Sequence, residues 1–243
     1  MFLKSIESKP AVGIFSKTTD SAFVEAAGIA GLDFIILDQE HGPVSLETLH
    51  NHVRAAKLTH MAPVVRVKGL DSHAIGAALD SGAAGVQVPN INTAEQARIA
   101  VSAARFHPAG QRGVCRFVRA ASYGTQDRAE YFRNANNALL VLQVEGVEGI
   151  SNLDEILDIK GFDVLFVGPY DLSQSIGKPG EIDSPEVLRL IKTIAEKAKE
   201  KGVILGGFCD SSEGLRFLQD LDFRYISYSV DLNIFINSLK GLR

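Results

Sequence analysis

The chain has 243 residues, of which 46% are hydrophobic and 22% are charged, and its formal net charge is −4. This composition is typical of a globular protein with a sizeable core, and it gives no reason to expect a nucleic-acid partner. We find no apolar run long enough to cross a bilayer and no signal-peptide core, and Cys115 and Cys209 form no metal-spaced pair. We therefore expect a cytoplasmic protein with free thiols and no membrane partner.

Short apolar runs alternate with amphipathic helical stretches along the whole chain. The runs lie at 11–15, 33–37, 63–67, 85–88, 139–144, 163–167, 203–207 and 224–228. The expected helices lie at 21–30, 45–57, 71–80, 93–104, 147–157, 184–201, 211–219 and 231–239. Several begin at an N-cap residue and several end at a glycine, as at Ser45, Thr93, Ser211, Gly31, Gly82 and Gly202.

Strand–helix alternation predicts a parallel sheet of the α/β class. Eight such units in roughly 250 residues match a (β/α)₈ TIM barrel, and no linker divides the chain, so we predict a single barrel domain over 1–243. A doubly wound open sheet is the alternative. The one long irregular stretch, 105–128, is expected over the C-terminal mouth of the barrel, with Arg105, Arg112, Arg116 and Arg119 in solvent.

The run at 139–146, LLVLQVEG, indicates where the chemistry lies. Side chains alternate along a strand, so Leu139, Val141, Gln143 and Glu145 share one face, and the face turns polar at its end. The next run breaks at Gly168-Pro169 before Asp171. Two carboxylates at the ends of successive parallel strands suit Mg²⁺ or Mn²⁺, with Co²⁺ a further candidate. Taken singly, Glu145 is equally well a first-turn helix acid, and Asp171 a helix N-cap.

Other polar residues follow the second and third strands. Asp38, Glu40 and His41 come after the second strand, and Arg66 ends the third. A metal-chelated 2-keto acid, His41 as proton carrier and Arg66 beside the enolate oxygen would form a coherent lyase site. Arg66 paired only with Asp38, and His41 as a surface residue, are the structural alternatives. Lys68, two residues beyond Arg66, is the candidate Schiff-base lysine of a metal-free aldolase.

Five motifs in order resemble the HpcH/HpaI aldolase family of metal-dependent class II pyruvate aldolases, which act on 2-keto-3-deoxy sugar acids or 4-hydroxy-2-oxoheptanedioate. They are DFIILDQEHGP at 33–43, PVVRV at 63–67, RGVCRFVRAASYG at 112–124, QVE at 143–145 and GPYDLSQSIG at 168–177. The chain departs from the family pattern at 206–212 and 227–231, beside the expected aldehyde pocket.

The resemblance implies a role for each matching residue. Glu145 and Asp171 match the metal ligands, and His41 with Asp38 matches the proton-transfer pair. Asp80 matches an aspartate that in relatives reaches a neighbouring subunit's site, so it is a further catalytic candidate, and a homo-oligomer, commonly a hexamer, is implied. The residues implied to contact the keto acid are Arg66, Gln143, Gly168, Pro169 and Tyr170.

The sequence thus predicts an aldolase that reversibly cleaves a 4-hydroxy-2-oxo acid into pyruvate and an aldehyde. Three alternatives stay open: an acyl-CoA lyase of the citrate lyase β-subunit type, a Schiff-base aldolase using Lys68, and a non-catalytic keto-acid binder. A CoA enzyme needs basic groups for the phosphates, and the arginines of 105–128 are the candidates for that role.

Overall fold

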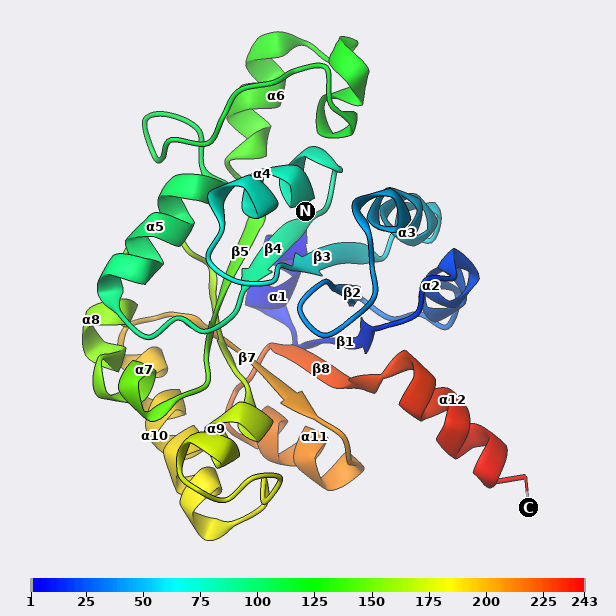
Figure 1. Ribbon diagram of the computed structural model, residues 1–243. Helices are drawn as coiled ribbons and strands as arrows, with labels where there is room; N and C mark the ends of the chain where they lie inside the picture. Colours follow the sequence, from blue (N-terminus) through cyan, green and yellow to red (C-terminus); the bar gives the residue numbers. More distant parts are fainter. Residues whose placement is uncertain (1, 243) are drawn as a thin grey trace.

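A computed structural model describes residues 2–242 as a closed barrel of eight parallel strands in the order β1 to β8, surrounded by helices (Figure 1). This confirms the predicted (β/α)₈ fold. The strands are β1 Ala11–Ser16, β2 Phe34–Asp38, β3 Ala62–Arg66, β4 Gly85–Val88, β5 Leu139–Val144, β6 Val164–Val167, β7 Ile204–Cys209 and β8 Tyr225–Val230. The helices are α1 Phe2–Ser8, α2 Ser21–Ile29, α3 Leu46–Leu58, α4 Ser72–Asp80, α5 Ala94–Ala104, α6 Arg128–Ala135, α7 Val147–Ser151, α8 Leu153–Leu157, α9 Pro169–Ser175, α10 Pro185–Glu200, α11 Ser212–Asp220 and α12 Asp231–Lys240.

Period-two alternation divides the core into two layers. Leu139 and Val141 of β5 lie in the cluster that fills the barrel, whereas Leu140 and Leu142 pack against the surrounding helices. The same inner face of β5 continues to Gln143 and Glu145 at its C-terminal end. The alternation expected from the sequence is therefore the one that aims these polar groups into the mouth.

Several helices begin at the predicted N-cap residues and are followed by the predicted glycines. The side chains of Ser45 and Ser211 accept backbone N–H groups of the first turn, and Thr93 forms a capping box with Gln96. The predicted glycine ends adopt positive φ angles, +90° at Gly31 and +83° at Gly82. Only glycine adopts such angles without strain, so these residues end their helices and release the chain into the next strand.

Three helices were not expected. Helix α1 lies across the N-terminal end of the barrel, where Ile6 is fully buried and the Phe2 ring lies 5.8 Å from that of Phe34. Helices α6 and α9 occupy segments for which the sequence analysis predicts no helix. The expected helix 147–157 is instead two short helices, with Asn152 between them donating to the Asn92 carbonyl at 2.8 Å.

The predicted position of 105–128 is wrong. This segment follows α5, which returns to the N-terminal end of the barrel, so it lies at the end opposite the mouth and forms with α6 the upper lobe of Figure 1. Arg105 is 5% exposed and donates to the carbonyls of Ala138 and Gly161, which precede β5 and β6. Arg112 is 7% exposed. These arginines tie the segment down and are not solvated.

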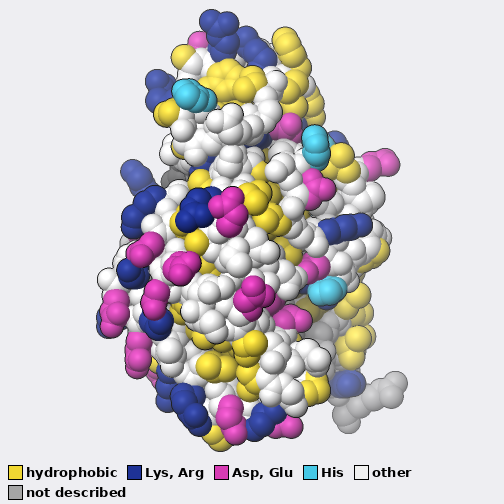
Figure 2. All heavy atoms as spheres, turned by 60° about the vertical axis from the view of Figure 1, so that its left-hand side comes forward, with side chains coloured by type: hydrophobic (Ala, Val, Ile, Leu, Met, Phe, Trp, Pro, Cys, Tyr) yellow, Lys and Arg dark blue, Asp and Glu magenta, His cyan; other side chains and the backbone are white. Residues whose placement is uncertain are grey.

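The surface carries charges of both signs. Lys197 and Lys201 of α10 pair with Asp154 and Asp158 at 2.7 and 2.6 Å, and acidic and basic side chains alternate over this side in Figure 2. Apolar side chains gather on the upper lobe, where Phe117 is 73% exposed. Within residues 2–242, no helix combines the length and apolar character that spanning a bilayer requires.

Candidate active site

A cavity of about 360 Å³ opens at the C-terminal end of the barrel. One part of its wall is apolar, formed by Phe15, Phe166, Phe208 and Val230. The remaining lining residues are polar or belong to the loop after β6: Lys17, His41, Arg66, Gln143, Gly168, Pro169, Tyr170 and Asp171. Seven of the residues predicted from the sequence, Arg66 among them, therefore line the same cavity.

Arg66, at the end of β3, is held by two acids. Its Nε and Nη2 donate to the two oxygens of Asp38 at 2.9 and 2.7 Å, and its Nη1 lies 3.1 Å from Oε2 of Glu40. The guanidinium also lies 4.6 Å from the centre of the Phe15 ring. Of the five N–H donors that an arginine carries, three are engaged in these contacts, which leaves two for a substrate.

The same contacts set the ionisation of this cluster. Burial acts to raise the pKa of Asp38, but the hydrogen bonds and charge of Arg66 outweigh it and hold that pKa below its usual range. Burial raises the pKa of Glu40, against the charge of Arg66. Asp38 is fully buried and paired, so it positions Arg66 and the backbone N–H groups of Glu40 and His41.

A chain of amides leads to Glu145. Nε2 of Gln87 donates to Oε1 of Gln143 at 2.5 Å, and Nε2 of Gln143 donates in turn to Oε2 of Glu145. The other oxygen of Glu145 accepts the backbone N–H of Asn90 at 2.9 Å. Asn90 has a φ of +58°, a conformation that asparagine tolerates, and this bend aims its N–H at the carboxylate.

Asp171 faces the same space from the first turn of α9. Its carboxylate accepts no hydrogen bond from residues 2–242, so the alternative of an N-cap is wrong, and Gly168 holds the N-cap position instead. Burial raises the pKa of Glu145 to about 7, and the nearby charge of Asp171 adds to the rise while the Gln143 bond opposes it. The two carboxylates thus lie within electrostatic reach of each other.

Gly168 permits this approach. A Cβ at Gly168 would lie 2.7 Å from Oε2 of Glu145, so any larger residue would displace the carboxylate. Among the described residues, no group of three or more His, Cys, Asp or Glu side chains converges as for a protein-enclosed metal. Two carboxylates with open positions are instead the donor set that magnesium uses when water and substrate complete its shell.

Tyr170, the third residue of the predicted GPY segment, is 45% exposed at the rim. Its hydroxyl donates to Oδ2 of Asp210 at 2.5 Å, and this bond, with burial, raises the pKa of Tyr170 to about 12. The phenol is therefore a hydrogen-bonding group at neutral pH and does not act as a base.

Of the three remaining residues predicted from the sequence, one lines the cavity and two do not. His41 is exposed on the loop after β2 and lines the cavity. Lys68 is exposed beyond the end of β3 and is absent from the cavity lining. Asp80 lies at the end of α4, on the N-terminal side, where Oδ1 accepts from Nη2 of Arg112 at 2.5 Å. Within one chain it does not reach the mouth, so its assignment to a neighbouring subunit's site stays a prediction.

Three residues of the site were not predicted from the sequence. Gln87 lies on the inward face of β4, which strand alternation indicates, whereas Asn90 follows β4 and reaches Glu145 through its backbone N–H in a left-handed turn. Lys17 lines the cavity, and its Nζ lies 3.5 Å from Oδ2 of Asp38. The signal for Lys17 was its position directly after β1, at the same end of the barrel as the other candidates.

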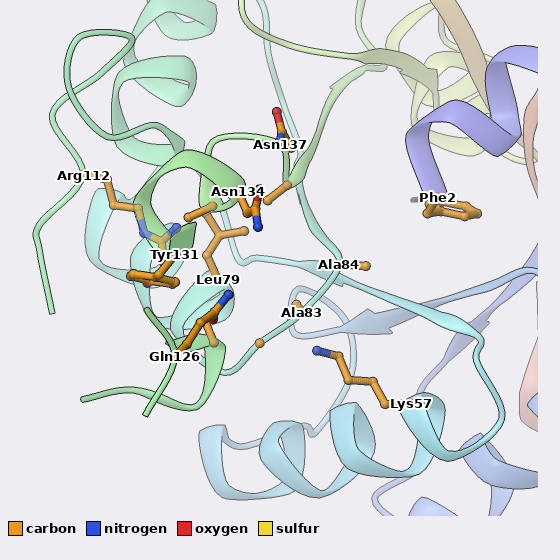
Figure 3. A pocket seen from close by; sticks show the side chains of 14 residues that line it. Phe2, Lys57, Leu79, Ala83, Ala84, Arg112, Gln126, Tyr131, Asn134 and Asn137 are labelled. Carbon is orange, nitrogen blue, oxygen red and sulfur yellow. The ribbon is translucent and has the colours of Figure 1, made fainter. Parts of the chain in front are cut away.

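A second cavity, of about 320 Å³, lies at the opposite end of the barrel (Figure 3). It is bounded by α6, the start of β4 and α1, and Lys57, Arg112 and Tyr131 line it. None of the predicted site residues lines this cavity, so it is separate from the chemistry at the mouth.

Comparisons with known proteins identify the family of the chain. Residues 11–238 match the model of the family described as HpcH/HpaI aldolase/citrate lyase. The 2-keto-3-deoxy-L-rhamnonate aldolase of Escherichia coli K12 is 34% identical over 230 residues, covering 94% of this chain and 85% of that protein. The enzyme of the same name from Salmonella gallinarum is 38% identical over 202 residues, covering 82% and 75%.

Solved structures give the same result. A crystal structure of an HpcH/HpaI aldolase/citrate lyase family protein from Burkholderia cenocepacia J2315 superposes with a TM-score of 0.93 at 30% identity, covering 99% of this chain and 96% of that one. The predicted enzyme class, a carbon–carbon lyase of the aldolase type, is confirmed by these similarities. By motif, fold and overall similarity, the chain belongs to the HpcH/HpaI aldolase/citrate lyase family.

Proposed function

We propose that this aldolase uses Mg²⁺ or Mn²⁺ to cleave a 4-hydroxy-2-oxo acid reversibly into pyruvate and an aldehyde. The observation that carries the proposal is the pair Glu145 and Asp171 beside Gln143 at the mouth of the barrel. The relatives named as 2-keto-3-deoxy-L-rhamnonate aldolases support a 2-oxo acid as the substrate.

The residues present fit a divalent cation. Glu145 is 5% exposed, and such a buried carboxylate beside a second one is unfavourable unless a cation or a proton neutralises it. Asp171 has free oxygens among the described residues, and Gly168 leaves room between the two strand ends. When bound, the ion would act as a Lewis acid on the keto group of the substrate.

The surrounding side chains supply the rest of the chemistry. In the cleavage direction the 4-hydroxyl loses its proton and becomes the aldehyde carbonyl as the bond between C3 and C4 breaks. The pair from that bond forms the double bond between C2 and C3, and the carbonyl pair moves to the C2 oxygen. Protonation of the resulting enolate at C3 gives pyruvate. The two unengaged N–H groups of Arg66 stabilise the negative charge that forms there. His41 lines the same cavity and moves the proton between solvent and substrate.

The alternatives are less well supported. The arginines that would bind CoA phosphates lie at the far end of the barrel, since Arg105 and Arg112 hold the segment 105–128 in place. Lys68 is exposed and does not line the cavity, which disfavours it as a Schiff-base nucleophile. A mere binder would have no use for a histidine at the edge of the keto-acid pocket.

We also infer a homo-oligomer. Helix α12 extends away from the barrel in Figure 1 and exposes an apolar face formed by Leu232, Phe235, Ile236 and Leu239. The hexameric state implied by the family resemblance, and the cytoplasmic location expected from the free cysteines, stay predictions.

Removal and return of the metal tests the proposed function. Exchange of the C3 protons of pyruvate in deuterium oxide is expected to stop after treatment with EDTA and to recover with Mg²⁺ or Mn²⁺. The E148Q variant, at an exposed acid on α7, is the control and should behave as the wild type. Exchange that persists after complete chelation would contradict the proposal.

A further inference from the structure

Lys17 lines the cavity, and no step of the proposed chemistry uses it. It directly follows β1, and its side chain is 32% exposed. The nearest acid, Asp38, already receives two hydrogen bonds from Arg66, and the 3.5 Å gap between Nζ of Lys17 and Oδ2 exceeds hydrogen-bond length. Within residues 2–242 the ammonium forms an ion pair with Asp38 but donates no hydrogen bond, so its three N–H donors remain available to a ligand in the cavity.

The backbone beneath Lys17 is fixed in place. Asp231, the first residue of α12, is 6% exposed and receives the hydroxyl of Ser16 at 2.8 Å and the backbone N–H of Lys17 at 3.1 Å. The backbone N–H of Thr18 adds a longer contact of 3.4 Å. A buried carboxylate thus holds the turn after β1, and the lysine side chain starts from a rigid point on the rim.

Barrel geometry sets where this ammonium lies relative to the metal carboxylates. In a closed ring ordered β1 to β8, β1 stands opposite β5, so Lys17 and Glu145 belong to opposite sides of the mouth. The wall that joins them is formed by Phe15, Phe166 and Phe208. A substrate whose keto acid lies at Glu145 and Gln143 therefore runs along aromatic rings and ends near an ammonium.

We propose that Lys17 is the specificity-determining residue for the aldehyde half and that it binds a carboxylate at the far end of that half. The substrates so selected are 4-hydroxy-2-oxo dicarboxylic acids. A single ammonium matches the single charge of a carboxylate, and Arg66, the other cation of the lining, is already engaged by two acids. The assignment rests on the proposed function for its place in the reaction, but its binding consequence is measurable separately.

Binding of two uncleavable acids of equal length tests the assignment. 2-Oxoheptanedioate and 2-oxoheptanoate both lack the 4-hydroxyl, and they differ only in the terminal carboxylate. Calorimetry on the full chain with Mg²⁺ at low salt is expected to show the diacid binding at least about tenfold more tightly than the monoacid. In K17M this preference should fall by about 10- to 100-fold, whereas K17R should keep most of it.

The matched control is K68M, which removes an exposed lysine outside the cavity and should leave the preference unchanged. A role for Lys17 limited to supporting Asp38 predicts that K17M weakens both acids equally, so the ratio would stay constant. That result, or a wild-type protein without preference for the diacid, overturns the assignment.

Kinetics on the same proteins separate the two proposals. Succinic semialdehyde and butanal, condensed with pyruvate, should give a ratio of kcat/KM that falls about 10- to 100-fold in K17M and not in K68M. If pyruvate exchange and condensation are both absent in the wild type, the proposed function fails, and the binding ratio alone decides the role of Lys17.

Discussion

At the scale of single residues, two acids at the mouth show how surroundings decide ionisation. Asp38 and Glu145 are both buried, with exposures of 0% and 5%. Asp38 faces Arg66, which holds its pKa below the usual range despite burial, so it is a fixed negative charge. Burial raises the pKa of Glu145 to about 7, and the charge of Asp171 adds to the rise, while the hydrogen bonds from Gln143 and Asn90 oppose it.

This shift predicts a pH-dependent metal affinity. Below pH 7 the metal-free protein carries a proton on Glu145, and a cation must displace it, so the affinity for Mg²⁺ should fall about tenfold per pH unit below that point. Calorimetry at pH values of about 6, 7 and 8 in buffers of different ionisation enthalpy should detect about one released proton at the lowest pH.

In the same metal-free protein, a raised carboxyl pKa means that the folded state binds the proton more tightly than the unfolded state. The contribution of Glu145 to stability therefore increases as pH falls from about 7 towards 4.5, the usual pKa of a glutamate. In the calorimetry, the E145Q variant should release no proton when it binds Mg²⁺ at low pH, whereas E148Q should release one as the wild type does. An affinity that does not change between pH 6 and 8 in the wild type would contradict the assignment of Glu145 as a ligand.

The positions of site residues could be predicted where side chains follow the regular inward and outward alternation of a strand. Gln143 and Glu145 follow from counting along β5, and the pairing of Arg66 with Asp38 was foreseen as the structural alternative. The contact of Asn90 with Glu145 depends on a left-handed turn, and the place of Lys17 depends on Asp231, which is more than two hundred residues away in sequence. The position of Lys17 after β1 can be read from the sequence, but these contacts form only when the barrel closes.

At the scale of elements, the junction of β6 and α9 brings Asp171 close to Glu145. Gly168 lies between them with an ordinary negative φ of −94°, so its role is space and not backbone freedom. In G168A the added Cβ would lie 2.7 Å from Oε2 and 3.2 Å from Cβ of Glu145. We expect metal affinity to fall about 10- to 100-fold with little change in circular dichroism or Tm.

The control for this prediction is G69A. A Cβ added at Gly69 meets nothing within 4 Å, so metal affinity there should match the wild type. Equal metal affinities in G168A and the wild type would show that the carboxylate relaxes without cost, which would contradict the close fit between the two strand ends.

Element prediction succeeded where hydrophobic periodicity was strong and failed elsewhere. All eight strands and the main helices follow from apolar runs, caps and glycines. Segment 105–128 was misplaced because it was assigned to the strand before it, although α5 had already carried the chain to the opposite end of the barrel. Helix α9, only seven residues long, was hidden by the Gly-Pro break in front of it.

At the scale of the whole molecule, α12 is the element least covered by its own chain. Ile236 and Leu239 lie one turn apart and are 49% and 48% exposed. In the double variant I236D/L239D, we expect light scattering after size exclusion to show a smaller assembly than the wild type, because two charges cannot be buried in an apolar contact.

N237D places one charge on the same helix at an exposed polar position and is the control, with the wild-type mass expected. Circular dichroism should show that both variants keep their helices. A double variant whose mass equals that of the wild type would exclude this face from the subunit contact.

The anchoring of residues 16–18 by Asp231 has a consequence for biosynthesis. The first strand leaves the ribosome more than two hundred residues before Asp231, whose carboxylate fixes the turn behind that strand. In a nascent polypeptide that has only the first seven strands, the barrel is not closed and the backbone of Lys17 is not yet held by Asp231. If Lys17 selects the substrate as proposed, that selection requires β8 and the start of α12 to have been synthesised.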